Sequence, residues 1–494
     1  MSVASAREHL SVVTALVGAA VTIALLGIGL STESVAMTTT ATIVGAGVAL
    51  AVLWVDRRRA FALLAFLVCY SLFLLGRQAV NLLLGVPDRQ DGVLGTGASS
   101  ISSMQQANVV LLTGILGLMA GYLLAPERSR PTTRTTLSDS APAVRRAAAR
   151  LMVLSVPGVL VAIWTTMSTV STSGYYDGRI MAASAIPFPV RVLEALFHAS
   201  FFAFLAARPA RREAGRACLL YLVIATLSLA TLARVEFLLS AMIVVVYLFH
   251  RQVTYDERWF TARRLVTAAL ATPPLLALLN QLGSLRGRGP ESTTGLFAPL
   301  LDFLRAQGVS VKVIVFGDEL SASIPDDRWY SVGPLVEFTQ RIWGMISGTP
   351  QPTFTGQSAE RALEGHQLAH TISYLIAPYD YLRGTGYGSS YLAELMIDLG
   401  LVGVFAGSAV YGYLLVRASS SLQSSIPLAF ITLMLLKGSM FVPRASFVQP
   451  LVDPFATPSL AALVILVVGV QLARSRKRRA ESKPTRPVPL ELRR

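Results

Sequence analysis

Residues 384–407 read GTGYGSSYLAELMIDLGLVGVFAG, a glycine-rich turn that runs directly into a long apolar segment. That segment is long and apolar enough to cross a membrane as a helix. It carries two carboxylates, Glu394 and Asp398, which are four residues apart and therefore lie on one helical face. The long polar region 282–389 comes just before this membrane segment. We therefore expect the chemistry of the protein where this polar region meets the bilayer.

The composition is that of a membrane protein. Of 494 residues, 53% are hydrophobic and 14% are charged. We predict an all-α, polytopic membrane fold of about twelve transmembrane helices with one large extracytoplasmic loop. Only Arg7 precedes the first span and no A-x-A-like site follows it, so we interpret this span as retained rather than as a cleaved signal peptide. The predicted spans are residues 10–30, 41–55, 60–85, 107–125, 148–167, 190–207, 216–232, 235–250, 265–281, 390–416, 424–441 and 455–473.

The distribution of positive charge predicts the topology. The net charge is +15, but it is concentrated in alternate connections, which argues against a nucleic-acid partner. We predict a multi-pass protein of the bacterial cytoplasmic (inner) membrane, with both termini cytoplasmic and residues 282–389 outside. The basic connections are 56–59, 126–150, 208–216, 251–264 and the tail from Arg474. The alternate connections 31–40, 86–106 and 168–189 have only two basic residues, Arg89 and Arg179.

Composition shifts divide the chain into consecutive units. Proline, serine and threonine in the stretch 126–150 are typical of a flexible cytoplasmic linker. The loop 282–389 contains tryptophans, phenylalanines and a helix-like run at 356–376, so short helices lying over the bundle are expected there. The predicted units are a four-span unit 1–125, the linker 126–150, a five-span unit 151–281, the loop 282–389, a three-span unit 390–473 and a basic cytoplasmic tail 474–494.

Several basic residues lie at the predicted outer level, where the positive-inside pattern normally excludes them. Snorkelling to lipid phosphates would explain any one of them, as would pairing with Glu194, Glu236, Glu394 or Asp398. For the whole set we favour a site for an anionic ligand, because guanidinium forks bind phosphate oxygens bidentately. The set consists of Arg77, Arg191, Arg234, Arg286, Arg288, Lys437 and Arg444.

The glycine-rich turn and the histidines are further candidates. Gly384, Gly386 and Gly388, with Ser389 and Ser390, place backbone N–H groups at a helix N-terminus, which is either an anion seat or a structural cap. His366 and His370 are four apart, but HExxH is absent, so zinc is disfavoured. Either histidine could instead act as a general base, hydrogen-bond a sugar or phosphate, or have a structural role.

Other motifs are missing. The sequence has no P-loop, no D-x-D and no GxSxG, so we expect neither a metal nor another cofactor. Cys69 and Cys218 lie in different spans and are interpreted as apolar core residues.

Five pieces between about 232 and 447 resemble, in order, the O-antigen and capsular polysaccharide polymerases of the Wzy type. They are LARVEFLLS, RGRG, FLRAQGVSVKVI with Gln307, Gly308 and Ser310, HTISY followed by GTGYGSSYLAELMIDLGLVGVFAG, and FVPRASF. The resemblance implies a metal-independent membrane glycosyltransferase of the broad GT-C type. Its donor would be a growing glycan on polyprenyl pyrophosphate, and its acceptor one repeat unit on the same carrier.

The resemblance also suggests roles for single residues. Glu394 or His370 would be the base, and Arg234 would act with Arg286, Arg288 and Arg444 on the pyrophosphate, where arginines stabilise the developing charge. The remaining predicted substrate-binding residues are Gln307, Ser310, Tyr374, Gly386, Gly388, Ser389 and Lys437.

Two other functions are weighed against polymerisation. An O-antigen-ligase-like transferase would use the same donor and a different acceptor. A lipid-linked oligosaccharide flippase would alternate access through a central cavity, and the long outer loop and one-sided cations argue against it. Expected partners are polyprenyl-linked glycans, the bilayer, a flippase and a chain-length regulator.

Overall fold

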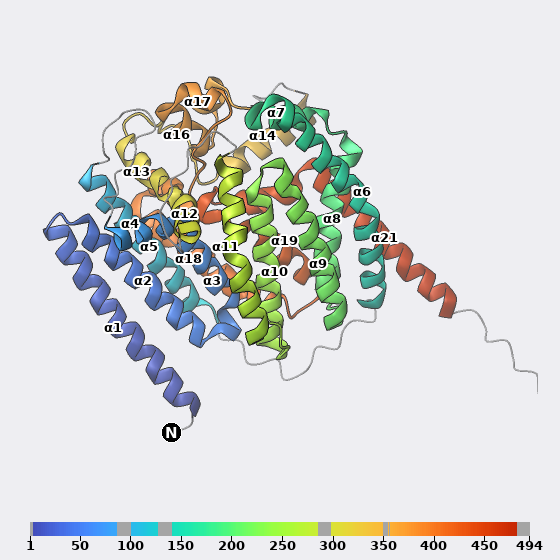
Figure 1. Cartoon of the computed structure of the whole chain (residues 1–494), viewed down its shortest axis with the longest axis horizontal. Helices are drawn as coiled ribbons and strands as arrows, with labels where there is room; N and C mark the ends of the chain where they lie inside the picture. Colours follow the sequence, from blue (N-terminus) through green and yellow to red (C-terminus); the bar gives the residue numbers. More distant parts are fainter. Residues whose placement is uncertain are drawn as a thin grey trace, which may run out of the picture.

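The computed structural model describes residues 3–85, 100–126, 141–284, 298–348, 354 and 356–481. Within these ranges the secondary structure is helical and contains no β-strand, which confirms the all-α prediction. The helices form a bundle that is covered at one end by short helices (Figure 1).

Eleven helical segments in the described ranges are long and apolar enough to cross a membrane, so the chain is a multi-pass membrane protein. The predicted first span lies within α1 (Val3–Ser31), but the described apolar part of that helix, Leu16–Ser31, is shorter than the others. The eleven segments are α2 (Val35–Val55), α3–η1–α4 (Arg57–Tyr70, Ser71–Leu75, Gly76–Leu84), α5 (Ile101–Leu124), α6 (Ala141–Ser173), α8 (Phe188–Ala206), α9–η2 (Arg211–Leu227, Ser228–Thr231), α10 (Arg234–Tyr255), α11 (Ala262–Ser284), α18 (Tyr391–Ser421), α19–η4 (Ile426–Ser439, Val442–Arg444) and α21 (Thr457–Glu481).

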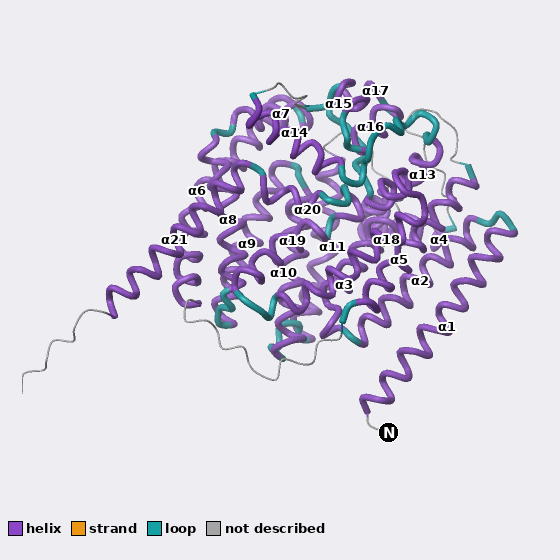
Figure 2. Tube along the Cα trace, turned by 180° about the vertical axis from the view of Figure 1, so that it is seen from behind, coloured by secondary structure: helices purple, strands orange, loops and turns teal. Residues whose placement is uncertain are grey.

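Most of the short helices gather at one end of the bundle, which we call the loop end. It lies at the top of Figure 1 and again at the top of the rear view in Figure 2, opposite the N-terminus. The helix-like run 356–376 is divided there, because Gly365 is extended (φ −74°, ψ 164°) and separates α15 from α16. The short elements are α7 (Tyr175–Ala185), α12 (Ala298–Gln307), η3 (Gly308–Ser310), α13 (Val311–Glu319), α14 (Gly333–Ser347), α15 (Ala359–Glu364), α16 (Leu368–Ile376), α17 (Pro378–Leu382), α20 (Gln449–Val452) and η5 (Asp453–Phe455).

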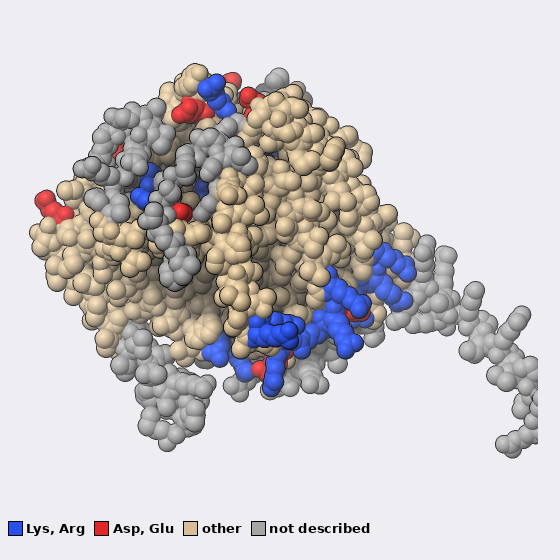
Figure 3. Space-filling view, viewed as in Figure 1, with Lys and Arg blue, Asp and Glu red and all other residues tan. Residues whose placement is uncertain are grey.

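Lysine and arginine mark the opposite end, which we call the basic end. Figure 3 shows them gathered along the lower edge of the molecule, where α9, α10 and α11 end or begin. Arg58 pairs there with Asp256 across 3.3 Å. The tan surface between the two ends carries little charge in this view, as expected of a lipid-facing band.

Glycines allow α5 and α18 to pack backbone to backbone at the centre of the fold. A Cβ added at Gly121 would lie 2.0 Å from the carbonyl oxygen of Ala409, and one at Gly412 would lie 2.2 Å from that of Leu118. Membrane helices associate through such small residues because lipid offers no hydrophobic driving force between them. This contact fixes α18, whose first turn carries Glu394.

Candidate functional site

Three short non-α segments meet at the loop end. The π-helical segment η1 interrupts the α3–α4 span, and both η3 and η4 pack against it. A Cβ added at Gly308 in η3 would lie 2.1 Å from the backbone nitrogen of Arg77. The glycine of the QG piece is therefore required by packing, and it brings Gln307 and Ser310 next to the π segment. Such π segments occur often at functional sites.

Basic side chains surround this junction. Arg444 at the end of η4 directs Nη1 to Oε1 of Gln307 at 3.5 Å, a long contact that links two pieces far apart in sequence. Arg77 and Lys312 are both buried, at 3% and 4% exposure. Buried charges in a membrane protein are costly and commonly mark a ligand site. Lys312 lies within the quoted FLRAQGVSVKVI piece, yet sequence reasoning gave it no role.

Ser310 supplies a polar atom at the same junction. Its side chain is 0% exposed, and its Oγ has no hydrogen-bond partner among the described residues. An unsatisfied buried hydroxyl is unfavourable unless a ligand or water binds it. The substrate-binding prediction for Ser310 is thus compatible with its surroundings.

The HTISY piece holds the glycine-rich turn. Ser373 Oγ accepts a hydrogen bond from the backbone N–H of Tyr387 at 3.0 Å and donates to the carbonyl of Ala369 at 2.6 Å. A Cβ at Gly386 would lie 3.1 Å from Ser373 Oγ, so Gly386 permits this close approach. Gly388 has φ +81°, a conformation that favours glycine. Both predicted glycines therefore shape the turn.

His370 projects from α16 toward α17. Its Nδ1 lies 3.0 Å from the hydroxyl of Tyr381, whose ring also packs edge-on against Tyr374. Burial, assisted by the charge of Arg361, lowers the pKa of His370 to about 3. The imidazole is therefore neutral at physiological pH and able to hydrogen-bond a sugar or phosphate. His366 lies outside α16 and binds Glu337 through its backbone N–H, so the two histidines do not share a helical face.

Glu394 lies in the first turn of α18 and connects the glycine-rich turn with the segment that follows Arg444. Its side chain is 0% exposed. Oε1 accepts hydrogen bonds from Ser389 at 2.6 Å and Ser446 at 2.5 Å, and Oε2 accepts one from the backbone N–H of Phe447 at 2.9 Å. Both oxygens are therefore engaged, which suits positioning the glycine turn against the Arg444 turn better than accepting a proton.

Asp398 ties a different segment to the same helix. Its two oxygens accept the backbone N–H groups of Tyr330 and Ser331 at 3.0 and 2.7 Å. The two carboxylates of α18 thus share a helical face as expected, but each holds a different loop. Carboxylates that accept backbone N–H donors in this way are strong local anchors.

Lys437 belongs to a second polar cluster. It pairs with Glu236 in the first turn of α10, and His198 and Ser240 also contact that carboxylate. Arg234 at the start of α10 donates to the carbonyl of Leu279 at 2.8 Å. Sequence reasoning named Glu236 as a pairing partner and quoted it within the LARVEFLLS piece, but gave it no catalytic role. It omitted His198, although a histidine inside an apolar span is itself a signal. Arg286 and Arg288 lie outside the described residues.

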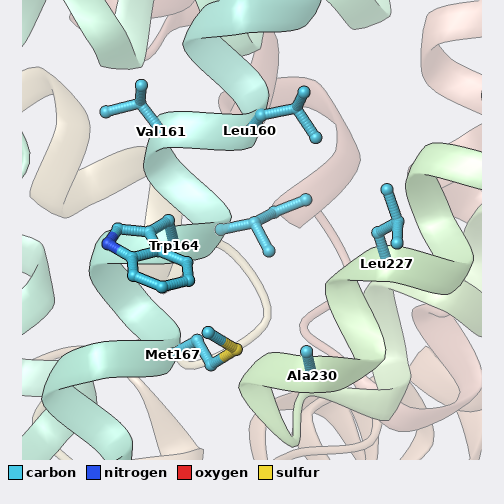
Figure 4. A pocket seen from close by; sticks show the side chains of 7 residues that line it. Leu160, Val161, Trp164, Met167, Leu227 and Ala230 are labelled. Atoms are coloured by element: carbon cyan, nitrogen blue, oxygen red, sulfur yellow. The ribbon is translucent and has the colours of Figure 1, made fainter.

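An apolar pocket of about 430 Å³ is lined by residues of α6, α9 and η2. Figure 4 shows Leu160, Trp164 and Met167 of α6 facing Leu227 and Ala230 of α9 and η2. Its lining offers no group for acid–base chemistry. Within the described residues we therefore assign the functional site to the polar network at the loop end.

The fold and this network define a polytopic membrane protein with an arginine-containing polar site at one end of its helix bundle. The chain belongs to the O-antigen polysaccharide polymerase Wzy family, whose model matches residues 15–477. The resemblance of residues 232–447 is thereby confirmed and extends over nearly the whole chain. Family membership supports an O-antigen polymerase of the glycosyltransferase type. No curated protein and no solved structure matches the chain significantly.

Proposed function

We propose that this protein polymerises polyprenyl-pyrophosphate-linked oligosaccharide repeat units at the outer face of the bacterial cytoplasmic membrane. The loop end would face outward, since arginine and lysine gather at the opposite end (Figure 3). A flippase would deliver the lipid-linked units to that face, and a chain-length regulator would act beside the polymerase.

The observation that carries the proposal is the junction of η1, η3 and η4, where Arg444 reaches Gln307 and two further cations are buried. A pyrophosphate leaving group needs fixed positive charge as its bond to the sugar breaks. Arginine provides that charge together with two parallel donors. In this reaction the acceptor hydroxyl attacks the anomeric carbon of the donor, and lipid pyrophosphate departs. Metal is not required in this scheme.

His370 and the glycine-rich turn would bind the glycan beside this junction. Tyr381 orients the neutral imidazole through Nδ1, and Gly386 and Gly388 let the turn approach closely. Glu394 would position the turn rather than react, because both of its oxygens are engaged.

The test uses proteoliposomes supplied with purified lipid-linked repeat units. Arg444→Lys keeps the charge but loses the planar fork. We expect long-chain product to fall about 100-fold, the loss typical of one removed oxyanion donor, with unreacted single units remaining. Arg417→Lys, toward the opposite end of α18, is the matched control and should polymerise normally.

A normal glycan ladder from Arg444→Lys would remove Arg444 from the pyrophosphate site. Transfer of glycan by the wild-type protein to an added lipid A acceptor, without growth on lipid-linked units, would instead show a ligase.

A further inference from the structure

The second polar cluster joins four membrane helices around one carboxylate. Glu236 on α10 accepts hydrogen bonds from Lys437 of α19 and from Ser240, which lies one turn away at 3.4 Å. Nε2 of His198 on α8 lies 3.7 Å from the same carboxylate. All three contact the same oxygen, Oε1. His198 uses its other ring nitrogen, Nδ1, to reach the hydroxyl of Tyr221 on α9 at 2.8 Å.

The other oxygen of Glu236 is open. No hydrogen bond or ion pair reaches Oε2 from any residue that the structure describes. The Glu236 side chain is 41% exposed although it belongs to a membrane-spanning helix, while Lys437 and His198 are 16% and 27% exposed. The carboxylate is thus held by one oxygen and presents the second to accessible space.

The groups around Glu236 are themselves fixed. Tyr221 is 1% exposed, and its ring stacks on Phe201 with centroids 3.9 Å apart and planes 5° from parallel. That stack sets the position of the hydroxyl, which in turn orients the imidazole of His198. A reacting group needs such rigid support to keep its geometry. Arg234 starts the same helix two residues before Glu236.

We propose that Glu236 is the general base that activates the acceptor hydroxyl, a role that rests on the proposed polymerase function. As the acceptor oxygen attacks the anomeric carbon, its proton passes to Oε2 of Glu236. The bond from that carbon to the pyrophosphate oxygen breaks, and lipid pyrophosphate leaves with the electron pair. His198, Tyr221 and Lys437 are positioning residues that hold Oε1.

The experiment separates loss of the base from loss of structure by changing the nucleophile. Azide carries no proton to remove, so it needs no base when it attacks the donor. In proteoliposomes, Glu236→Ala should lose about 100-fold or more in polymerisation with hydroxyl acceptors, the usual range for a missing general base. It should still convert the donor to glycosyl azide, detected by mass spectrometry, within a few-fold of the wild type. Equal loss of both reactions would overturn the proposal.

A double variant with swapped charges, Glu236→Lys with Lys437→Glu, tests without azide whether Glu236 is needed only for its ion pair with Lys437. It restores the α10–α19 contact but removes the carboxylate from its position. Protein present at normal membrane level with little polymer supports the base role, and recovered polymerisation overturns it. Glu213→Gln, in the first turn of α9 at the basic end, is the matched control and should leave both reactions intact.

Failure of the base role is distinct from failure of the polymerase function. If wild-type protein forms no polymer from lipid-linked units, the function proposed above is wrong. If wild-type protein polymerises and Glu236→Ala does so equally well, only the base assignment falls.

Discussion

Glu236 and Glu394 each lie in the first turn of a membrane helix, and the two carboxylates have opposite surroundings. Glu394 in α18 is sealed, with both oxygens bonded to Ser389, Ser446 and Phe447. Glu236 in α10 is bound through one oxygen and its side chain is 41% exposed. A helix N-terminus favours either carboxylate equally. The two carboxylates differ in how many of their oxygens accept hydrogen bonds from neighbouring residues. A carboxylate with both oxygens bonded stabilises the fold, whereas one with a free oxygen can react.

The largest expected effect is the loss of stability when Glu394, the fully hydrogen-bonded carboxylate, is removed. Glu394→Ala leaves two serine hydroxyls and one backbone N–H without an acceptor in a buried site, at about 1–3 kcal/mol for each unsatisfied group. We expect the membrane level of this variant to fall more than that of Glu236→Ala, whose partners can reach water. Immunoblots of membranes and thermal unfolding in detergent measure the difference. Equal membrane levels of Glu394→Ala and Glu236→Ala would show that the buried carboxylate does not contribute more to stability than the exposed one.

Hydropathy was sufficient to predict the all-α fold and eleven of the twelve expected spans, because membrane helices are local in sequence. Resemblance identified the motif pieces, and the structure brings Gln307 of one piece to Arg444 of another. Glu236 of the LARVEFLLS piece lies in the second polar cluster instead. The contacts that separate the two carboxylates could not be predicted, since Glu394 meets Ser446 at a separation of 52 residues and Glu236 meets Lys437 at 201. The prediction that Glu394 or His370 is the base was made without these contacts, which occupy both oxygens of Glu394.

A smaller loss of stability is expected from a substitution at the junction beside Arg444. Gly308→Ala would place a Cβ 2.1 Å from the backbone nitrogen of Arg77, and backbone cannot move as easily as a side chain. Overpacking of this kind costs about 1–3 kcal/mol. We expect a lower melting temperature and less polymer at equal protein level.

Gly215→Ala near the basic end is the control for this substitution. Its added Cβ would meet Trp259 at an ordinary 3.7 Å, so stability and polymer should stay unchanged. An unperturbed Gly308→Ala variant would mean that η1 and η3 can separate without cost, and that the junction does not fix Gln307 and Ser310.

The smallest effect concerns pH and the loop end. Burial and Arg361 lower the pKa of His370 to about 3 from an ordinary value of 6.5. Between those values the unfolded chain binds more protons at this position than the folded one, so stability is lost progressively as the pH falls below 6.5. The melting temperature of the wild type should therefore drop between about pH 7.5 and about pH 5.5, and His370→Gln, which cannot titrate, should show a shallower drop. Parallel curves for the two proteins would show that His370 is not buried as a neutral imidazole, and would remove the basis for its role as a glycan ligand held by Tyr381.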